Sequence, residues 1–351
     1  MLQLFGGLFL LVVGAEFSVR AAVRLAASLK VRPLIIGLTV VAMGSSAPQM
    51  AVSLQAALSS SPDISVGSVV GSNIFNVLVT LGLCALIIPL RVARRLVRVD
   101  IPLMIGASLL VFALSYNGEL SAFDGGVLLA SLLAYLLILA RRSRRNVQKT
   151  SPIQHHASRA QQLISLATLV LGLGLLVLGG YLLVQAAVVI AEDLGLSQRV
   201  IGLTVIAGST SLPALTTSLI AALRGERDIA VGNVIGSNLF NLLGVLGLTA
   251  LIAPSPLSIS PNALDFDLPV MLAVAALCLP VFYSGYRVTR AEGLLLLALY
   301  LAYGLHIVSF TTGMPLAEKL ERLMNYFVLP LLAALILFST VRAWRRQHKA
   351  G

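Results

Sequence analysis

Charge is scarce in this sequence of 351 residues. Only 11% of the residues are charged, against about 25% in a soluble domain, whereas 58% are hydrophobic. Hydrophobic runs of roughly 20 residues recur along the chain, and each is long enough to cross a bilayer as a helix. The runs are continuous rather than alternating, which argues against membrane-spanning strands. The sequence therefore predicts an all-α, multi-pass membrane protein whose main partner is the lipid bilayer.

Groups for redox, metal or enzyme chemistry are also few. The two cysteines, Cys84 and Cys278, lie inside apolar runs, where buried small side chains are expected rather than a disulfide or a zinc site. The predicted spans contain no His/Glu metal motif, no Ser–His pair and no paired carboxylates. We therefore expect no enzyme activity and no resident cofactor.

A long internal repeat organises what is present. The stretch from Gly37 to Pro89 recurs from Gly202 to Pro254, and about 30 of its roughly 53 positions are identical without a gap. Similarity at a fixed spacing marks a duplicated structural unit. The sequence therefore predicts two related halves.

The hydrophobic runs predict eleven spans. They lie at about 4–27, 33–58, 66–90, 100–116, 124–141, 163–191, 199–223, 230–254, 267–284, 288–309 and 325–343. The predicted organisation is a first repeat over 1–141, a basic cytoplasmic linker over 142–162, a second repeat over 163–309, and a C-terminal part over 310–351. That last part holds an amphipathic segment, the extra eleventh span and a basic tail.

The basic residues predict the orientation. If the chain begins outside, all 25 Lys and Arg residues except Arg199, Lys319 and Arg322 fall on the cytoplasmic side. The positive-inside rule then places the N-terminus outside and the C-terminus in the cytoplasm. The net charge of +11 is thus explained by topology and not by nucleic acid binding, although the basic linker could also contact anionic lipid headgroups. Because the second copy starts five spans after the first, the two copies are inverted, as in many secondary transporters.

Each copy carries two polar clusters. The first is GSSAPQ from Gly44 to Gln49, matched by STSLPA from Ser209 to Ala214, and the proline in each predicts an interrupted helix with freed carbonyls. The second is GSNIFN, matched by GSNLFN. Such groups could simply hold packed membrane helices together. Their equivalent placement in both copies favours an ion pathway, because carbonyl and hydroxyl oxygens suit Na⁺ or Ca²⁺.

These motif pairs resemble the α-repeats of the cation/Ca²⁺ exchanger superfamily, and most nearly its prokaryotic Na⁺/Ca²⁺ exchanger branch, over about residues 4–309. The resemblance implies ten core helices in two inverted halves and antiport by alternating access in the bacterial inner membrane. It also implies an ion site made by the following residues, Ala42 and Ala207 through their carbonyls: Ala42, Ser45, Ser46, Gln49, Ser72, Asn76, Ala207, Thr210, Ser211, Ala214, Ser237 and Asn241.

The sequence departs from that family pattern at its acidic positions. The resemblance implies glutamate where Gln49 and Ala214 stand, and often an acidic residue where Asn241 stands. Ca²⁺ prefers about 6–8 oxygens that include carboxylates, so the local chemistry disfavours it. Three hypotheses follow: a sodium/calcium-type antiporter, the same fold carrying a monovalent cation or another solute with Na⁺, or a transport-inactive membrane binding protein. The sequence does not fix the transported ion, the stoichiometry or the oligomeric state.

A few acidic residues lie outside the motifs. Glu16 is one helical turn before Arg20 in the first span, which predicts either a local ion pair or a group that gates the ion path. Asp100, Asp265 and Asp267 precede spans, where the N-terminus of a helix favours anions.

Overall fold

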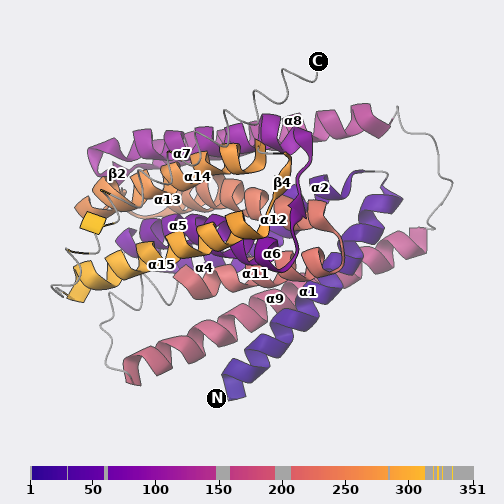
Figure 1. The fold of residues 1–351 in the computed structure, drawn as a ribbon, viewed down its shortest axis with the longest axis horizontal. Coiled ribbons are helices and arrows are strands. Elements are labelled where there is room, and N and C mark those ends of the chain that lie inside the picture. The colour runs from indigo at the N-terminus through magenta and orange to yellow at the C-terminus, as the bar shows by residue number, and fades with distance from the viewer. Residues whose placement is uncertain are drawn as a thin grey trace.

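The computed structural model is a bundle of long helices (Figure 1). It describes residues 2–29, 31–58, 62–147, 159–193, 207–283 and 285–312, together with Lys319, Arg322, Leu323, Tyr326 and Ala334. The middle of the basic linker lies outside the described residues, and so do most of the predicted amphipathic segment and most of the predicted span over 325–343.

The elements follow one another in two series. The first half contains α1 (Leu2–Ser28), α2 (Pro33–Ile36), η1 (Gly37–Val41), α3 (Ala42–Ser45), α4 (Ala47–Leu58), α5 (Pro62–Phe75), η2 (Asn76–Leu81), α6 (Gly82–Ile87), β1 (Leu90–Arg91), η3 (Leu96–Asp100), α7 (Ile101–Leu114), η4 (Ser115–Asn117), β2 (Glu119–Leu120) and α8 (Ala122–Val147). The second half contains α9 (Arg159–Asp193), α11 (Ala207–Leu223), α12 (Arg227–Leu239), η6 (Phe240–Val245), α13 (Leu246–Ile252), β3 (Leu257–Ser258), η7 (Ala263–Asp267), α14 (Leu268–Tyr283), β4 (Arg287–Val288) and α15 (Arg290–Thr312).

The predicted all-α membrane architecture is confirmed. Within the described residues, 8 helices are long and apolar enough to cross a membrane, or 9 if the bent pair Pro33–Ser45 and Ala47–Leu58 is one span. Each of the ten predicted core spans contains described helix, including α11 in the span predicted over 199–223. Helix α8 continues to Val147, past the predicted start of the linker.

Helices α1 and α9 cross on one side of the bundle and show how the halves are related (Figure 1). A Cβ added at Gly7 would lie 2.9 Å from the carbonyl oxygen of Gly179, and one added at Gly14 would lie 2.7 Å from the carbonyl oxygen of Gly172. The pairing is antiparallel. Gly7 and Gly172 are equivalent positions of the two copies, and so are Gly14 and Gly179. The contact of Gly7 with Gly179 is therefore equivalent to that of Gly172 with Gly14, with the two copies exchanged. Such an exchange is what a two-fold axis requires, and it confirms that the copies are inverted.

The two halves interlock rather than form separate units. Strand β1 pairs antiparallel with β4, and β2 pairs with β3, so each short ladder joins one half to the other. Helix α6 packs on α15, and α8 packs on α13. One cluster of buried side chains contains residues of both halves. Any site between the motif helices therefore lies inside a shared core.

The first polar motif breaks its helix in only one copy. The helix bends by 42° between Ser45 and Ala47, as the proline at position 48 predicts. In the second copy, α11 runs without interruption from Ala207 through Pro213 to Leu223, so the interruption predicted there is wrong within the described residues. Both copies have a Gly-Ser step and a proline here, so the packing of α11 on α1, α5 and α12, rather than local sequence, keeps this helix continuous.

Candidate functional site

The four polar motifs lie together in the core. Helices α3 and α4 carry the first motif of the first half, and α5 with the start of η2 carries its second motif. Helix α11, and α12 with the start of η6, carry the equivalents in the second half. Helix α11 packs on α5, and α12 packs on α3. Each motif pair therefore meets the opposite copy.

Gln49 is the centre of one polar cluster. Its Oε1 accepts hydrogen bonds from Ser72 Oγ at 2.8 Å and from Thr210 Oγ1 at 2.7 Å. Its Nε2 donates to Ser68 Oγ at 2.7 Å and to Ser53 Oγ at 3.2 Å. The side chain is 1% exposed, and these bonds use both donors and both acceptor directions of the amide. Thr210 is the only one of these partners that comes from the second half.

Asn233 is the centre of a second cluster. Its Oδ1 accepts a hydrogen bond from Ser45 Oγ at 3.0 Å, across the boundary between the copies. Its Nδ2 donates to Ser218 Oγ at 2.9 Å and to the carbonyl oxygen of Ala214 at 3.1 Å. Ser45 Oγ also lies 3.1 Å from Ser237 Oγ. The asparagine side chain is fully buried.

The two clusters are related by the inverted repeat. Ser45 and Thr210 are equivalent positions, and each hydrogen-bonds an amide oxygen of the opposite copy. The amides themselves are not at equivalent positions. The counterpart of Gln49 is Ala214, and the counterpart of Asn233 is Ser68. The second half thus supplies its amide from the neighbouring helix.

Further asparagines extend the clusters. Asn76 Nδ2 donates to Asn238 Oδ1 at 3.0 Å, which again joins the two copies. The Oδ1 atoms of Asn76 and Asn241 are buried and have no hydrogen-bond partner among the described residues. Buried polar atoms are nearly always satisfied in proteins, so these amide oxygens are candidates to bind a cation.

The structure brings most of the predicted site residues together. Gln49, Ser72 and Thr210 are hydrogen-bonded in the first cluster, and Ser45 and Ser237 are in contact in the second. Four more predicted residues are also buried: Ser46 between α3 and α4, Asn76 in η2, Ser211 on α11 and Asn241 in η6. Ala207 begins α11. Ala214 takes part only through its carbonyl oxygen, which accepts a hydrogen bond from Asn233.

The carbonyl of Ala42 differs from the prediction. It accepts the backbone N–H of Ser46 at 3.0 Å, and the hydroxyl oxygen of Ser45, whose hydrogen is directed to Asn233, lies 3.1 Å away. The helix break therefore does not free this oxygen, because the last turn before the break remains hydrogen-bonded.

Sequence reasoning missed four residues that complete the clusters: Ser53, Ser68, Ser218 and Asn233. Each lies four positions from a predicted site residue, and residues four apart share a helix face. The positions that share a face in each motif are therefore 45, 49 and 53; 68, 72 and 76; 210, 214 and 218; and 233, 237 and 241. All of them are polar except Ala214. Extending each motif by one turn would have found all four.

The oxygen atoms of the two clusters are uncharged and are hard ligands for a cation. The clusters contain hydroxyl, amide and carbonyl oxygens, and the described residues contain no group of three or more His, Cys, Asp or Glu that could hold a metal ion. Oxygen ligands of this kind suit alkali and alkaline-earth cations. No formal negative charge in the clusters offsets a divalent cation.

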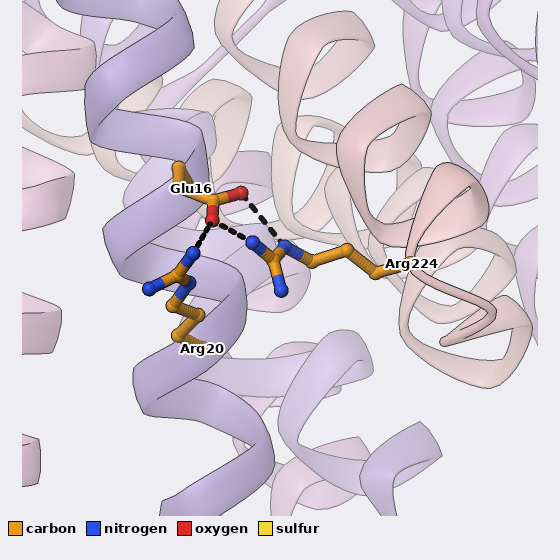
Figure 2. Close-up of polar contacts among 3 residues, drawn as sticks. All are labelled: Glu16, Arg20 and Arg224. Carbon is orange, nitrogen blue, oxygen red and sulfur yellow. Dashed lines mark hydrogen bonds and ion pairs between the residues drawn. The ribbon is translucent and has the colours of Figure 1, made fainter.

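Glu16 is a bridge between the two halves (Figure 2). One carboxylate oxygen lies 2.6 Å from Arg20, one turn along α1, as one hypothesis predicts. The same carboxylate also pairs with Arg224, which follows α11, and there Nε lies 2.7 Å from Oε2. The second contact spans 208 positions of sequence, so the local pair is only part of the arrangement.

Two carboxylates are buried elsewhere in the core. Asp267, the last residue of η7, accepts a hydrogen bond from Tyr303 at 2.9 Å, and Asp100, the last residue of η3, interacts with Tyr135 in the first half. Both aspartates are buried, whereas Asp265 is exposed. These carboxylates have tyrosine partners of their own and are not part of the hydroxyl and amide clusters.

Comparisons with known proteins agree with this arrangement. The pattern of the sodium/calcium exchanger protein family matches residues 1–141 and 164–309. Inner membrane protein YrbG of Escherichia coli is 39% identical over 275 residues, covering 77% of this chain and 84% of YrbG. Sodium/calcium exchanger MaX1 of Methanosarcina acetivorans is 32% identical over 334 residues, covering 85% of this chain and 95% of MaX1.

A solved structure shares the fold. The sodium-calcium exchanger NCX_Mj, soaked with 10 mM Na⁺ and zero Ca²⁺, superposes with a TM-score of 0.74 at 30% identity. The match covers 88% of this chain and 97% of that one. Sequence pattern, relatives and fold lead to the same assignment, and this chain belongs to the sodium/calcium exchanger protein family.

Proposed function

We propose that this chain is a secondary active cation antiporter of the sodium/calcium exchanger type that works by alternating access. The observation that carries the proposal is the reciprocal pair of contacts between the inverted copies, Thr210 to Gln49 and Ser45 to Asn233. Inverted-repeat transporters bind their substrates where the two copies meet. The protein acts as a transporter and not as an enzyme, and no resident cofactor takes part.

The proposed site consists of the polar positions of the four motifs. These are Ala42, Ser45, Ser46, Gln49, Ser72, Asn76, Ala207, Thr210, Ser211, Ala214, Ser237 and Asn241. Hydrogen bonds that cross between the copies can exchange partners when the halves shift, so the same oxygens can face either side in turn. The neutral oxygens favour Na⁺ as one substrate. Ca²⁺, named in the descriptions of the family and of MaX1, is the proposed counter-substrate.

The proposed location is the bacterial inner membrane, with the N-terminus outside and the C-terminus in the cytoplasm. The name of YrbG supports the location. The strand pair β1–β4 supports the orientation, because it joins Arg91 to Arg287 and both belong to loops expected in the cytoplasm. A Gln148→Cys variant should react with an impermeant thiol reagent only in inside-out vesicles. Reaction from outside intact cells would contradict the orientation.

Flux in proteoliposomes tests the function. Vesicles loaded with Na⁺ and diluted into Na⁺-free medium should take up ⁴⁵Ca²⁺ or a second monovalent cation, and the uptake should stop when the gradient is collapsed. Ser72→Ala together with Thr210→Val, which removes both hydroxyls from Gln49, should abolish uptake. Absence of gradient-driven flux across a broad panel of cations would contradict the proposal.

A further inference from the structure

We propose that Asn233 is a cation ligand of the second repeat and supplies the oxygen that the side chain at position 214 cannot. The inference rests on the proposed function and adds to it a residue outside the motif positions. It begins from the observation that the central amides of the two clusters, Gln49 and Asn233, are not at equivalent positions of the repeat. Gln49 lies on α4, whereas the amide of the second half lies on α12, one helix further along the chain.

The contacts of Asn233 reproduce those of Gln49. Each amide nitrogen donates to the serine one turn beyond the motif, Ser53 in the first half and Ser218 in the second. Each amide oxygen accepts a hydroxyl from the opposite copy, at 2.7 Å and 3.0 Å. Two different positions thus produce one pattern, so the amide itself, rather than its place in the sequence, is what the two half-sites share.

The amide oxygen of Asn233 can also accept one further contact. Gln49 Oε1 accepts two hydrogen bonds, which uses both of its lone pairs. Asn233 Oδ1 accepts a single bond from Ser45 among the described residues, so one lone pair stays available for a cation. The oxygen is fully buried, and an amide oxygen there is a hard, neutral ligand of the kind that Na⁺ and Ca²⁺ accept.

The rest of α12 and η6 offers oxygens on the same helix face. Ser237 lies one turn beyond Asn233 and is in contact with Ser45. Asn241 lies a further turn along, and its buried Oδ1 has no hydrogen-bond partner among the described residues. Three consecutive turns therefore present oxygen ligands, and Asn233 begins the series.

A symmetry exchange tests the assignment. Asn233→Ser gives the second half the serine that the first half has at Ser68, and it should raise the Na⁺ concentration for half-maximal exchange about tenfold. Adding Ala214→Gln to that variant rebuilds the glutamine and serine pair of the first half, but because the oxygen of Gln49 already accepts two hydroxyls, it should recover little of the lost affinity. Asn117→Ser is the control, since Asn117 lies in η4 outside the motif helices and its amide oxygen accepts the backbone N–H of Glu119. The control should keep the wild-type affinity.

A second variant tests the proposal even if the Asn233→Ser protein does not fold. Asn233→Asp keeps the shape of the side chain and adds a charge, so the ratio of Ca²⁺ to Na⁺ affinity should rise at least tenfold, measured by calorimetric titration of the purified protein. Unchanged affinities in a folded Asn233→Ser protein, or a wild-type ratio in Asn233→Asp, would overturn the assignment. Absence of flux in the wild type would instead contradict the proposed function, so the two failures are distinguishable.

Discussion

Thr210 of the second repeat donates a hydrogen bond of 2.7 Å to the side-chain oxygen of Gln49 in the first repeat. The two residues are 161 positions apart and are both buried. The bond holds α11 against α4 and orients the glutamine so that its nitrogen faces Ser53 and Ser68. One hydroxyl therefore orders the first cluster from the opposite half of the molecule.

Replacement of that hydroxyl should weaken cation binding. Thr210→Val keeps the volume of the side chain but removes the donor, and one buried hydrogen bond contributes about 1 kcal/mol. We expect the half-saturating Na⁺ concentration of exchange to rise several-fold. Thr210→Ser keeps the hydroxyl and should behave nearly as wild type. Equal effects of the two variants would show that the methyl group, and not the hydroxyl, is what matters.

Restoring carboxylates should raise the affinity for Ca²⁺. The wild type should bind Ca²⁺ weakly, because a divalent cation in a buried neutral site is poorly compensated. Gln49→Glu with Ala214→Glu returns two charges, and Gln49→Glu alone should help less.

Calorimetric titration in detergent measures this series. In the absence of Ca²⁺, the double glutamate variant should also unfold at a lower temperature, since two like charges would face each other in the core. Tight Ca²⁺ binding by the wild type would show that carboxylates are not needed. A well-folded double variant without Ca²⁺ binding would show that these helices do not form the cation site.

The bridge made by Glu16 should stabilise the packing of α1 in a salt-dependent way. The groups are partly exposed, with 26% exposure for the glutamate and 36% for Arg224, so the contribution is about 1 kcal/mol or less. Glu16→Gln should lower the midpoint of thermal unfolding by a few degrees at low ionic strength. At 1 M salt, where the Debye length is about 3 Å, the difference should nearly vanish. A loss of stability that is independent of salt would contradict an electrostatic role.

The crossing of α1 and α9 should depend on glycine. A Cβ at Gly172 would lie 2.8 Å from the carbonyl oxygen of Gly14 and 2.7 Å from the backbone nitrogen of Ser18. Gly172→Ala should therefore separate the helices and cost about 1–3 kcal/mol. Gly174→Ala, two positions along the same helix, meets nothing within 4 Å and should be neutral or slightly stabilising. Similar unfolding midpoints for the two variants would contradict this packing.

The sequence predicted the architecture because its signals are local or periodic. Length and hydrophobicity define the spans, and the repeat offset together with the basic residues defines the inversion. The same periodicity placed Ser45, Ser72 and Thr210 in the two polar clusters, because each lies in a motif that both copies share.

The features that the sequence did not reveal depend on tertiary contacts. Position-by-position transfer pointed to Ala214, but the amide that makes the equivalent hydrogen bonds belongs to Asn233, and no repeat equivalence links the two positions. The pairing of Glu16 with Arg224 joins segments whose proximity no local pattern indicates. Pro213 suggested a break, yet α11 continues through it because packing can outweigh local preference.

The location of a bound cation tests the central claim most directly. Crystals soaked in Tl⁺, a heavy stand-in for a monovalent cation, should show an anomalous peak between the two copies, within ligand distance of Asn233 Oδ1 and of hydroxyl oxygens from both Ser45 and Thr210. The peak should weaken when Na⁺ is added. A peak at the buried carboxylates Asp100 or Asp267 instead, or none between the motif helices, would contradict the account.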